Sequence, residues 1–258
     1  MPHPWSPSAS LAALRERTAT VAALRGYFAT RKVCEVTTPT LSTYASTEPT
    51  LASLTATSDA LERWYLRTSP ESAMKRLLAH GSGDIYQLGP VFRADERGRH
   101  HLIEFTLLEW YRVGFTLTQL MDDVEGLLRA VGFEAALARI TYGDLFRAHV
   151  GVSPHGLAST ELASLVAGLP VELAPADRED RALLFDCLYA CVLEPALRAM
   201  GAVLLYDFPV ELRAYARLTS SEPAVAARFE LVVDGLELAN GYHEILDEIG
   251  RASCRERV

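Results

Sequence analysis

The sequence has few cysteines and no long hydrophobic run. Four cysteines are scattered over 258 residues, which is too few for the disulfide framework of a small secreted protein. No stretch of about 18 or more apolar residues occurs, so a membrane-spanning helix is not expected. The N-terminus lacks the basic and apolar segments of a signal peptide, and we therefore expect a cytoplasmic location.

Lysine is also nearly absent, since Lys32 and Lys75 are the only lysines among the 25 lysines and arginines. Acidic residues number 33, and the formal net charge is −8. An acidic chain gains no general electrostatic attraction to a polyanion. The charge balance therefore counts against tRNA as a partner, although it leaves room for a local basic patch.

Two of the cysteines, Cys187 and Cys191, lie one helical turn apart in an apolar stretch. No histidine and no second cysteine pair accompanies them, as a structural metal site would require. We therefore expect two buried thiols on one helix face and not a metal site.

The composition is that of an ordinary globular protein. Hydrophobic residues make up 49% of the chain and charged residues 22%, with a mean hydropathy of +0.09. A chain of this length can bury one substantial core. We find no internal repeat and no linker, so the sequence predicts one α+β domain over residues 1–247.

Hydrophobic periodicity places the helices and strands. Apolar residues at helical spacing predict helices over residues 9–30 and 117–128 and a mainly helical region over residues 140–200. Ser69 as N-cap and Pro70 in the first turn favour the start of a third helix, which runs to about residue 80. The predicted strands cover residues 33–36, 61–68, 85–93, 103–112 and 202–208.

A hairpin is predicted near the C-terminus, where Asp234-Gly235 stands between the apolar runs 229–233 and 236–240. Asp-Gly between two such runs is the strongest short-range hairpin signal. Strands joined by short loops pair antiparallel, so we expect an antiparallel sheet with helices packed on it.

Several charged residues accompany these strands. Arg93 ends one predicted strand, and Glu109 and Tyr111 lie two residues apart on the next, which places both on one face of the sheet. Glu237 follows the hairpin turn, and Glu244 comes seven residues later. One such carboxylate is more often a solvated charge or half of a salt bridge, but the whole set favours a site for a cationic substrate and a metal-bound nucleotide.

Four segments of the chain carry a family resemblance. In order, they are residues 35–39 (EVTTP), 68–78 (TSPESAMKRLL), 92–112 (from FRADE to EFTLLEWYR) and 237–244 (ELANGYHE). Over residues 8–244 the chain resembles class II lysyl-tRNA synthetases, and most closely the elongation factor P–(R)-β-lysine ligases. No single segment would be a strong signal, but four in the right order are.

The resemblance implies an antiparallel class II sheet flanked by helices, and an enzyme that uses ATP and Mg²⁺ to form an aminoacyl-adenylate. It also implies roles for individual residues. Arg93 is expected to hold the α-phosphate and the substrate carboxylate. The expected amino-acid site comprises Ser69, Pro70, Glu71, Glu109, Tyr111 and Glu244. The expected ATP site comprises Arg93, Ala94, Asp95, Glu237 and Leu238, with Glu237 and Glu244 as magnesium ligands.

Two residues depart from the family pattern within the matched region. Asp95 stands where the family usually has glutamate, and its shorter side chain weakens the expected contact with adenine. Leu102 stands where an asparagine that contacts ATP is common. The neighbouring His100 and His101 offer polar groups in its place, although exposed loop histidines usually have no ligand role.

The resemblance favours a protein acceptor over tRNA. The first matched helix begins near residue 9, which leaves no room for the anticodon-binding barrel of a lysyl-tRNA synthetase. We therefore expect transfer of lysine or β-lysine to a lysine of elongation factor P, by a homodimer formed through that helix. The alternatives are a lysyl-tRNA synthetase core fragment acting on tRNA, and a non-catalytic paralogue that binds an amino acid or a nucleotide.

The match ends after Glu244, before the last conserved strand and helix of the family. The codons of residues 248–258 can spell a sequencing adapter, so we hypothesise that this tail is adapter read-through; a natural basic tail is the alternative. We expect the truncated chain itself to be nearly inactive.

Overall fold

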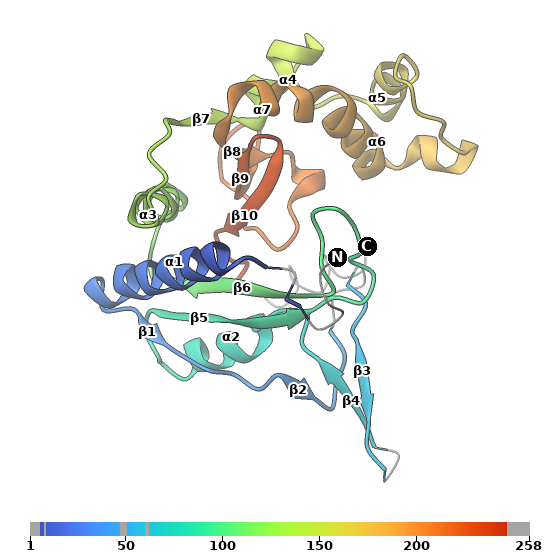
Figure 1. Cartoon of the computed structure of the whole chain (residues 1–258). Helices are drawn as coiled ribbons and strands as arrows, with labels where there is room; N and C mark the ends of the chain where they lie inside the picture. Colours follow the sequence, from blue (N-terminus) through green and yellow to red (C-terminus); the bar gives the residue numbers. More distant parts are fainter. Residues whose placement is uncertain (1–5, 8, 47–50, 60–61, 247–258) are drawn as a thin grey trace. The chain divides into compact units, whose positions relative to one another are not determined.

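The computed structural model describes residues 6–7, 9–46, 51–59 and 62–246 (Figure 1). They form two compact units. The first contains the residues up to Phe115 together with Gly126–Phe133, and the second contains Thr116–Glu125 and the residues from Glu134 onward. That residues 1–247 form one domain stays a prediction. The tail 248–258, with Cys254, lies outside the described residues.

The first unit is built on two small sheets. Its main sheet has the strand order β1-β5-β6, with β1 parallel to β5 and β5 antiparallel to β6, and its second sheet has the order β2-β4-β3 (Figure 1). The elements are α1 (Leu11–Thr30), β1 (Cys34–Glu35), β2 (Leu41–Ser42), β3 (Thr55–Thr57), β4 (Arg63–Leu66), α2 (Glu71–Ala79), β5 (Ile85–Phe92) and β6 (Glu104–Tyr111).

Helix α1 covers one face of the β5–β6 ladder. Tyr86 pairs with Trp110 across the two strands, so both side chains project from the same face. The fully buried ring of Phe28 stacks on Tyr86 with ring centres 4.3 Å apart, and it lies 5.8 Å from Trp110. Glu109 and Tyr111 occupy the alternate positions and therefore project from the opposite face.

Two polar side chains hold the segment after β1 against this sheet. Gln87 on β5 accepts a hydrogen bond of 2.8 Å from the backbone N–H of Thr38. Arg67 donates to the Thr38 carbonyl and to the Pro90 carbonyl, each at 3.0 Å. A Cβ atom at Gly89 would lie 3.1 Å from the Arg67 guanidinium, so glycine leaves room for that side chain.

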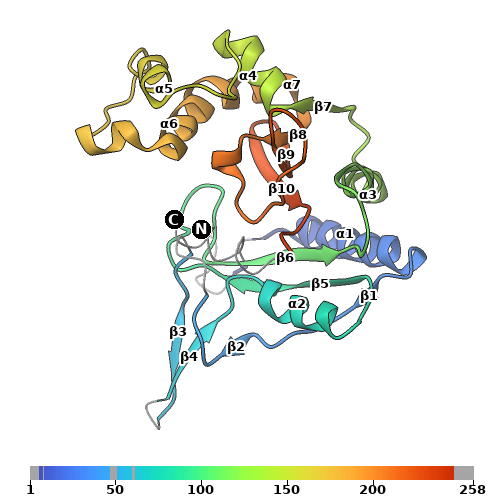
Figure 2. The ribbon, with the colours of Figure 1, turned by 180° about the vertical axis from the view of Figure 1, so that it is seen from behind.

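The second unit contains a four-stranded sheet of order β10-β9-β8-β7, in which β7 and β8 are parallel and the other pairs are antiparallel (Figure 2). Its strands are β7 (Leu137–Thr141), β8 (Ala202–Phe208), β9 (Ala226–Val233) and β10 (Leu236–Tyr242). Its helices are α4 (Tyr142–Val150), α5 (Ser159–Val166), α6 (Arg181–Leu188) and α7 (Glu194–Met200), with short turns η1 (Pro175–Glu179), η2 (Tyr189–Leu193) and η3 (Val210–Leu212). Helix α3 (Leu117–Ala130) has residues in both units.

Aromatic side chains fill the core of the second unit. The ring centres of Tyr142 and Phe208 lie 5.3 Å apart, and those of Phe146 and Phe185 lie 6.0 Å apart. These four residues are at most 2% exposed, and Val203 on β8 belongs to the same buried cluster. The sheet and helices α4 and α6 therefore share one apolar core.

The predicted hairpin is confirmed. Asp234 and Gly235 have φ values of 51° and 80°, and two successive positive φ angles are the signature of the tight turn that Asp-Gly favours. The β9–β10 register shifts between Glu237 and Ala239, so a bulge follows the turn directly.

The predictions for residues 9–30, 85–93, 103–112 and 202–208 are also confirmed, as is the α+β class. The expected antiparallel pairing is confirmed for most strand pairs, whereas β1 and β7 pair in parallel with β5 and β8. The first residues of the supposed helical region 140–200 belong to β7, and the two short strands β2 and β3 were missed.

Two further predictions need correction. Pro70, and not Ser69, occupies the N-cap position of α2, with a φ of −81° and no capping bond from its side chain. Ser69 Oγ, one residue earlier, accepts a 3.3 Å bond from the Glu71 N–H. Cys187 and Cys191 lie on α6 and on the π-turn η2, and both are half-buried and not fully buried. Among the described residues, no group of three or more potential ligands could hold a metal ion.

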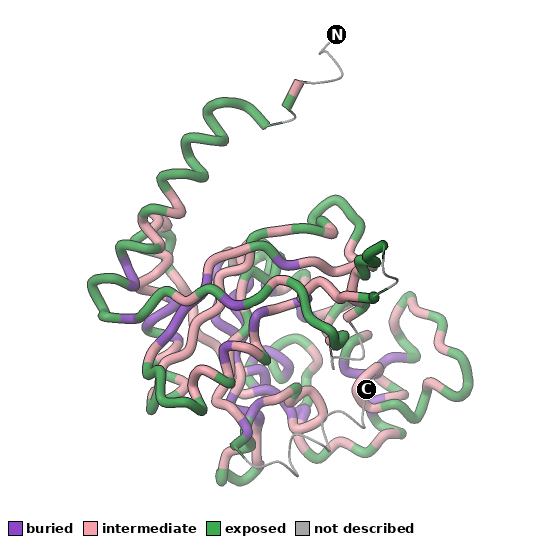
Figure 3. Tube along the Cα trace, turned by 90° about the horizontal axis from the view of Figure 1, so that it is seen from below, coloured by how far each residue is buried: buried purple, intermediate pink, exposed green. Residues whose placement is uncertain are grey.

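Helix α1 exposes most of its residues (Figure 3). Leu11 is 71% exposed and Leu14 is 45% exposed, whereas Tyr27 and Phe28 at the other end are buried. Within the described part of the chain, no helix combines the length and the apolar character needed to cross a membrane.

Asp207 offers a test of the energetics of the second unit. It lies at a bulge in β8 with a φ of 57°, and burial raises the pKa of its carboxyl. An acid with a raised folded-state pKa lowers stability as the pH rises above its unfolded-state pKa of about 3.9. Asparagine tolerates the same backbone without the charge, so we expect Asp207→Asn to raise the melting temperature by about 1–3 °C at neutral pH.

Thermal melts between neutral pH and pH ~4 check this expectation, because the gain must shrink as the pH falls. Asp207→Ala is the matched control: it removes the charge but tolerates the positive φ poorly, so its gain should be smaller. An equal gain at both ends of the pH range would contradict the explanation.

Candidate functional site

In the first unit, four predicted or neighbouring polar residues lie together. Glu71 opens α2, and Lys75 one turn later places its Nζ 2.6 Å from Glu71 Oε1. The Lys75 Nζ also lies 6.0 Å from the centre of the Tyr111 ring, and the Tyr111 hydroxyl donates a 2.8 Å bond to Glu109. The prediction that Glu109 and Tyr111 share a face is confirmed. This sheet face, with Glu71 and Lys75 of α2, therefore brings together two carboxylates, a phenol and an ammonium group.

Arg93 lies at the start of the loop that follows β5. Its backbone N–H donates to the Ile103 carbonyl at 2.9 Å, and its Nε donates to the Thr68 carbonyl at 3.3 Å. The guanidinium lies 5.1 Å from the ring centre of Phe105 and forms a 2.8 Å ion pair with Glu96. Because Phe105 projects from the same face as Glu109, Arg93 belongs to that face as well.

The residues around Arg93 differ in exposure. The backbone N–H of Ala94 donates to the Ala52 carbonyl at 2.9 Å, which anchors the start of the loop. Asp95, His100 and His101 are exposed, and Leu102 is 68% exposed. The carboxylate that pairs with Arg93 is that of Glu96, which the sequence had not singled out.

In the second unit, Glu237 and Leu238 begin β10 and Glu244 follows it. Glu237 is exposed and Leu238 is 59% exposed, at the bulge after the turn. Glu244 pairs with Ala216 in an isolated antiparallel bridge, and Arg217 donates from its backbone to the His243 carbonyl at 2.7 Å. Backbone pairing with a distant segment therefore holds the turn that carries Glu244.

Arg228 on β9 connects several polar groups of the second unit. Its Nε donates to the side-chain oxygen of Asn240 at 3.1 Å, and one terminal nitrogen donates to the Leu212 carbonyl at 3.0 Å. The other terminal nitrogen is paired with Glu230, and the guanidinium lies 4.6 Å from the Phe208 ring centre. Because a guanidinium only donates, it fixes the oxygen of the Asn240 amide toward itself and the amide N–H groups away from it.

Glu230 is a buried carboxylate, 7% exposed, in the middle of β9. Burial raises its pKa, and the Arg228 guanidinium acts in the opposite direction. The Tyr189 hydroxyl donates to it at 3.4 Å from the π-turn η2. Burial, followed by the charges of Glu230 and Glu237, raises the pKa of Tyr189. The charges of Glu230 and Glu237 therefore both act on the Tyr189 phenol, and Arg228 is the cation that balances Glu230.

The predicted site residues thus fall into two sets. The first unit contains Ser69, Pro70, Glu71, Arg93, Ala94, Asp95, Glu109 and Tyr111. The second unit contains Glu237, Leu238 and Glu244. Lys75 and Glu96 contact members of the first set, and Arg228 and Asn240 contact each other in the second unit. Two of these carried a sequence signal, because Lys75 stands four residues after Glu71 and Arg228 stands two residues before Glu230 in an apolar strand.

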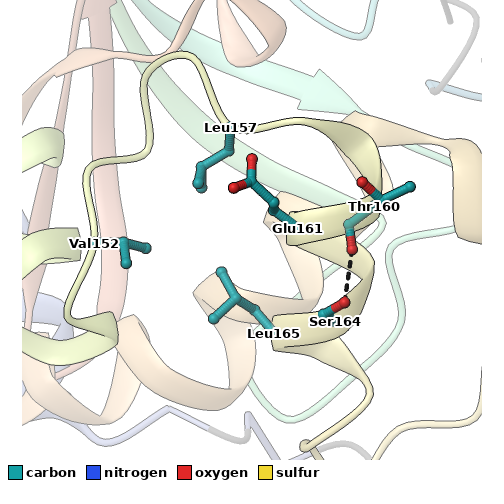
Figure 4. Close-up of a pocket in the computed structure, with 6 residues that line it drawn as sticks. All are labelled: Val152, Leu157, Thr160, Glu161, Ser164 and Leu165. Atoms are coloured by element: carbon teal, nitrogen blue, oxygen red, sulfur yellow. Dashed lines mark hydrogen bonds between the residues drawn. The ribbon is translucent and has the colours of Figure 1, made fainter.

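A separate hollow lies between the α4–α5 connection and α5 (Figure 4). Its lining residues are Val152, Leu157, Thr160, Glu161, Ser164 and Leu165. Ser164 donates to the Thr160 carbonyl at 2.8 Å, and Glu161 accepts from the Ala158 N–H at 2.7 Å. These polar groups serve the helix itself, and none of the predicted site residues lines the hollow.

The fold and these residues agree with the comparison to known families. Residues 6–253 match the family of class II tRNA synthetases (D, K and N), and the chain belongs to this family. The resemblance stated from the sequence is therefore confirmed, together with the class II fold.

Among its relatives are the elongation factor P–(R)-β-lysine ligases of three bacteria. The chain is 41% identical over 246 residues to that of Vibrio vulnificus (strain YJ016), which covers 93% of this chain and 76% of the relative. Over 249 residues it is 40% identical to that of Vibrio cholerae (strain El Tor Inaba N16961) and 39% identical to that of Yersinia enterocolitica (strain 8081), again with 76% of each relative covered.

Removing one partner of the Arg228–Glu230 pair should lower the stability of the protein strongly. The two side chains are 13% and 9% exposed, so removing the arginine alone leaves a buried carboxylate without its cation. We expect Arg228→Met to lower the free energy of unfolding by about 3 kcal/mol. Chemical denaturation measures this value.

Two comparisons sharpen the test. The double variant Arg228→Met/Glu230→Gln should be more stable than Arg228→Met, since the stranded charge is gone. Arg217→Met changes an exposed arginine of the same unit and should alter stability by less than about 0.5 kcal/mol. If Arg228→Met behaves like this control, Arg228 does not hold the buried carboxylate.

Proposed function

We propose that this protein activates lysine or β-lysine with ATP as an aminoacyl-adenylate and transfers it to a lysine side chain of elongation factor P. The observation that supports this most directly is the cluster of Glu109 and Tyr111 on one sheet face with Glu71 of α2, whose partner Lys75 approaches the Tyr111 ring. In a class II family member about 41% identical to an elongation factor P–(R)-β-lysine ligase, such a cluster suits a substrate that carries ammonium groups.

The cluster binds cations through charge and through an aromatic face. Carboxylates accept charge-assisted hydrogen bonds from ammonium groups, and these are stronger than neutral bonds. The Tyr111 hydroxyl donates to Glu109, which orients that carboxylate, and the face of the Tyr111 ring also attracts cations. We assign Glu71, Glu109, Tyr111 and Glu244 to the ammonium groups of the amino acid. Ser69 and Pro70 are assigned to the wall of the amino-acid site.

Arg93 is assigned to the reacting groups. A guanidinium is planar and always charged, and it can donate to a phosphate and to a carboxylate at the same time. Its position on the Phe105 ring, with Nε on the Thr68 carbonyl, restricts its orientation. The phosphate of ATP would compete with Glu96 for the same guanidinium. Ala94, Asp95 and Leu238 are assigned to contacts with ATP.

Family membership implies the use of ATP, and we propose magnesium as its counter-ion. Mg²⁺ usually takes one or two protein carboxylates, with phosphate oxygens and water as its other ligands. Glu237 and Glu244 offer the carboxylates of such a donor set: Glu237 is exposed at the start of β10, and Glu244 is half-buried just after the end of this strand. When bound, the ion would neutralise charge on the phosphates.

The reaction needs no general base in its first step. The ionised carboxylate of the amino acid attacks the α-phosphorus of ATP, a mixed anhydride forms, and pyrophosphate leaves. The neutral amine of the acceptor lysine then attacks the activated carbonyl, an amide forms, and AMP leaves. Positioning of the amino acid by Glu71 and Glu109, together with charge neutralisation by Arg93, would supply most of the rate enhancement.

We further propose a protein acceptor and a dimeric enzyme. The names of the relatives and the net charge of −8 support elongation factor P over tRNA. The exposed Leu11 and Leu14 support α1 as the dimer contact, because burying such side chains against a second copy removes apolar surface from water.

The proposed function is tested with the full-length protein. ATP–pyrophosphate exchange with α-lysine, with (R)-β-lysine and without amino acid shows whether, and with which substrate, an adenylate forms. Mass spectrometry of elongation factor P then shows whether one amino acid is added. Charging of bulk tRNA at a comparable rate would instead favour a synthetase core, and no exchange at all would favour a non-catalytic binding protein.

Substitutions in the cluster should separate amino-acid binding from ATP binding. We expect Glu71→Gln and Tyr111→Phe to weaken amino-acid binding by about tenfold each, because each removes an interaction with the substrate ammonium or with the carboxylate that binds it. Calorimetry should show little change in the affinity for ATP. Equal losses for both ligands would contradict the assignment of these residues to the amino-acid site.

A further inference from the structure

Lys75 takes part in the cluster but has no role in the proposed chemistry so far. Its Nζ lies 2.6 Å from Glu71 Oε1, and the two side chains are 14% and 26% exposed. Lys75 follows Met74, which is completely buried, so the backbone of this turn of α2 is held in the core. The ammonium group is therefore fixed beside the carboxylate that is assigned to the substrate.

The residue type is unusual for this chain. Lys75 is one of two lysines among 25 lysines and arginines, and the other, Lys32, is exposed. Lysine carries a compact charge on a flexible stem, whereas arginine presents a wide planar fork. The compact ammonium group of Lys75 fits beside Glu71 and lies 6.0 Å from the centre of the Tyr111 ring.

We propose that Lys75 is a positioning residue, which holds one oxygen of Glu71 and so directs the carboxylate to the ammonium of the amino acid. This inference rests on the proposed function. A glutamate side chain has several accessible rotamers, and an ion pair with a neighbour one turn away selects among them. The cation also offsets the negative charge of Glu71 before substrate binds.

A surface ion pair without such a role would behave differently. Pairs four residues apart on a helix contribute little to stability, and removing one leaves substrate binding unchanged. A positioning residue acts on one ligand only, and only through its partner. The kinetic constants of single and double variants can therefore distinguish the two cases.

Pyrophosphate exchange of the full-length protein provides the first measurement. We expect Lys75→Met to raise KM for the amino acid by about tenfold, to leave KM for ATP within about twofold, and to change kcat little. Lys75→Arg should recover part of the loss, because it keeps the charge. Arg76→Met removes an exposed cation from the next position of the same helix and should leave all three constants unchanged.

The double variant Glu71→Gln/Lys75→Met tests whether Lys75 acts through Glu71. We expect its KM for the amino acid to equal that of Glu71→Gln, because the proposed effect of Lys75 on the amino acid requires the Glu71 carboxylate. An unchanged KM in Lys75→Met, an equal loss for ATP, or independent losses in the double variant would each overturn the proposal.

Chemical footprinting provides a readout that needs no activity. Reductive methylation followed by mass spectrometry compares Lys75 with Lys32 within the same chain, which thereby supplies its own reference. We expect Lys75 to react more slowly than Lys32 and Glu71→Gln to accelerate Lys75 alone. If no amino acid supports exchange in the wild type, the proposed function fails. The methylation rates then still test the Lys75–Glu71 ion pair. If Glu71→Gln leaves the ratio of the Lys75 rate to the Lys32 rate unchanged, the pairing is overturned.

Discussion

The β5–β6 ladder determines which residues meet in the first unit. Its register runs without a shift from Ile85 opposite Tyr111 to Phe92 opposite Glu104. Since side chains alternate along a strand, this register gives one face to the stack of Phe28 on Tyr86 and the other to the polar cluster. A slip by one residue would place Glu109 against α1 and the aromatic side chains on the site face. The apolar packing of α1 therefore also positions the polar cluster.

Three acidic groups in the two units are each paired with a basic residue of the same unit. Glu71 pairs with Lys75, Glu96 with Arg93 and Glu230 with Arg228. Carboxylates next to apolar surface lose hydration, and an adjacent cation offsets that loss. The pairs differ in exposure: the Arg228–Glu230 pair is the most buried and serves the structure of β9 and β10, whereas the other two remain accessible to a ligand.

Sequence periodicity predicted the elements whose signal is local. Residues 202–206 form an uninterrupted apolar run, and Asp234-Gly235 favours a particular backbone, so this strand and the hairpin were found from the sequence. Strand β7 was missed because its five residues are held by parallel pairing with β8, which is distant in the chain. The strands β2 and β3 have only two and three residues, too few for a periodic pattern.

The candidate site was predictable to a similar degree, and for a related reason. Glu71, Arg93, Glu109 and Tyr111 were found because their spacing follows a motif, whereas Lys75 and Glu96 are defined by the partner each one contacts. Their ion pairs are made with the same groups that would hold substrate and ATP, so an incoming ligand exchanges one charged partner for another. Such an exchange leaves fewer charges to desolvate than binding to an isolated carboxylate or guanidinium would. The site can therefore be pre-oriented and still release its residues to the ligand, which is the property that adenylate formation by positioning requires.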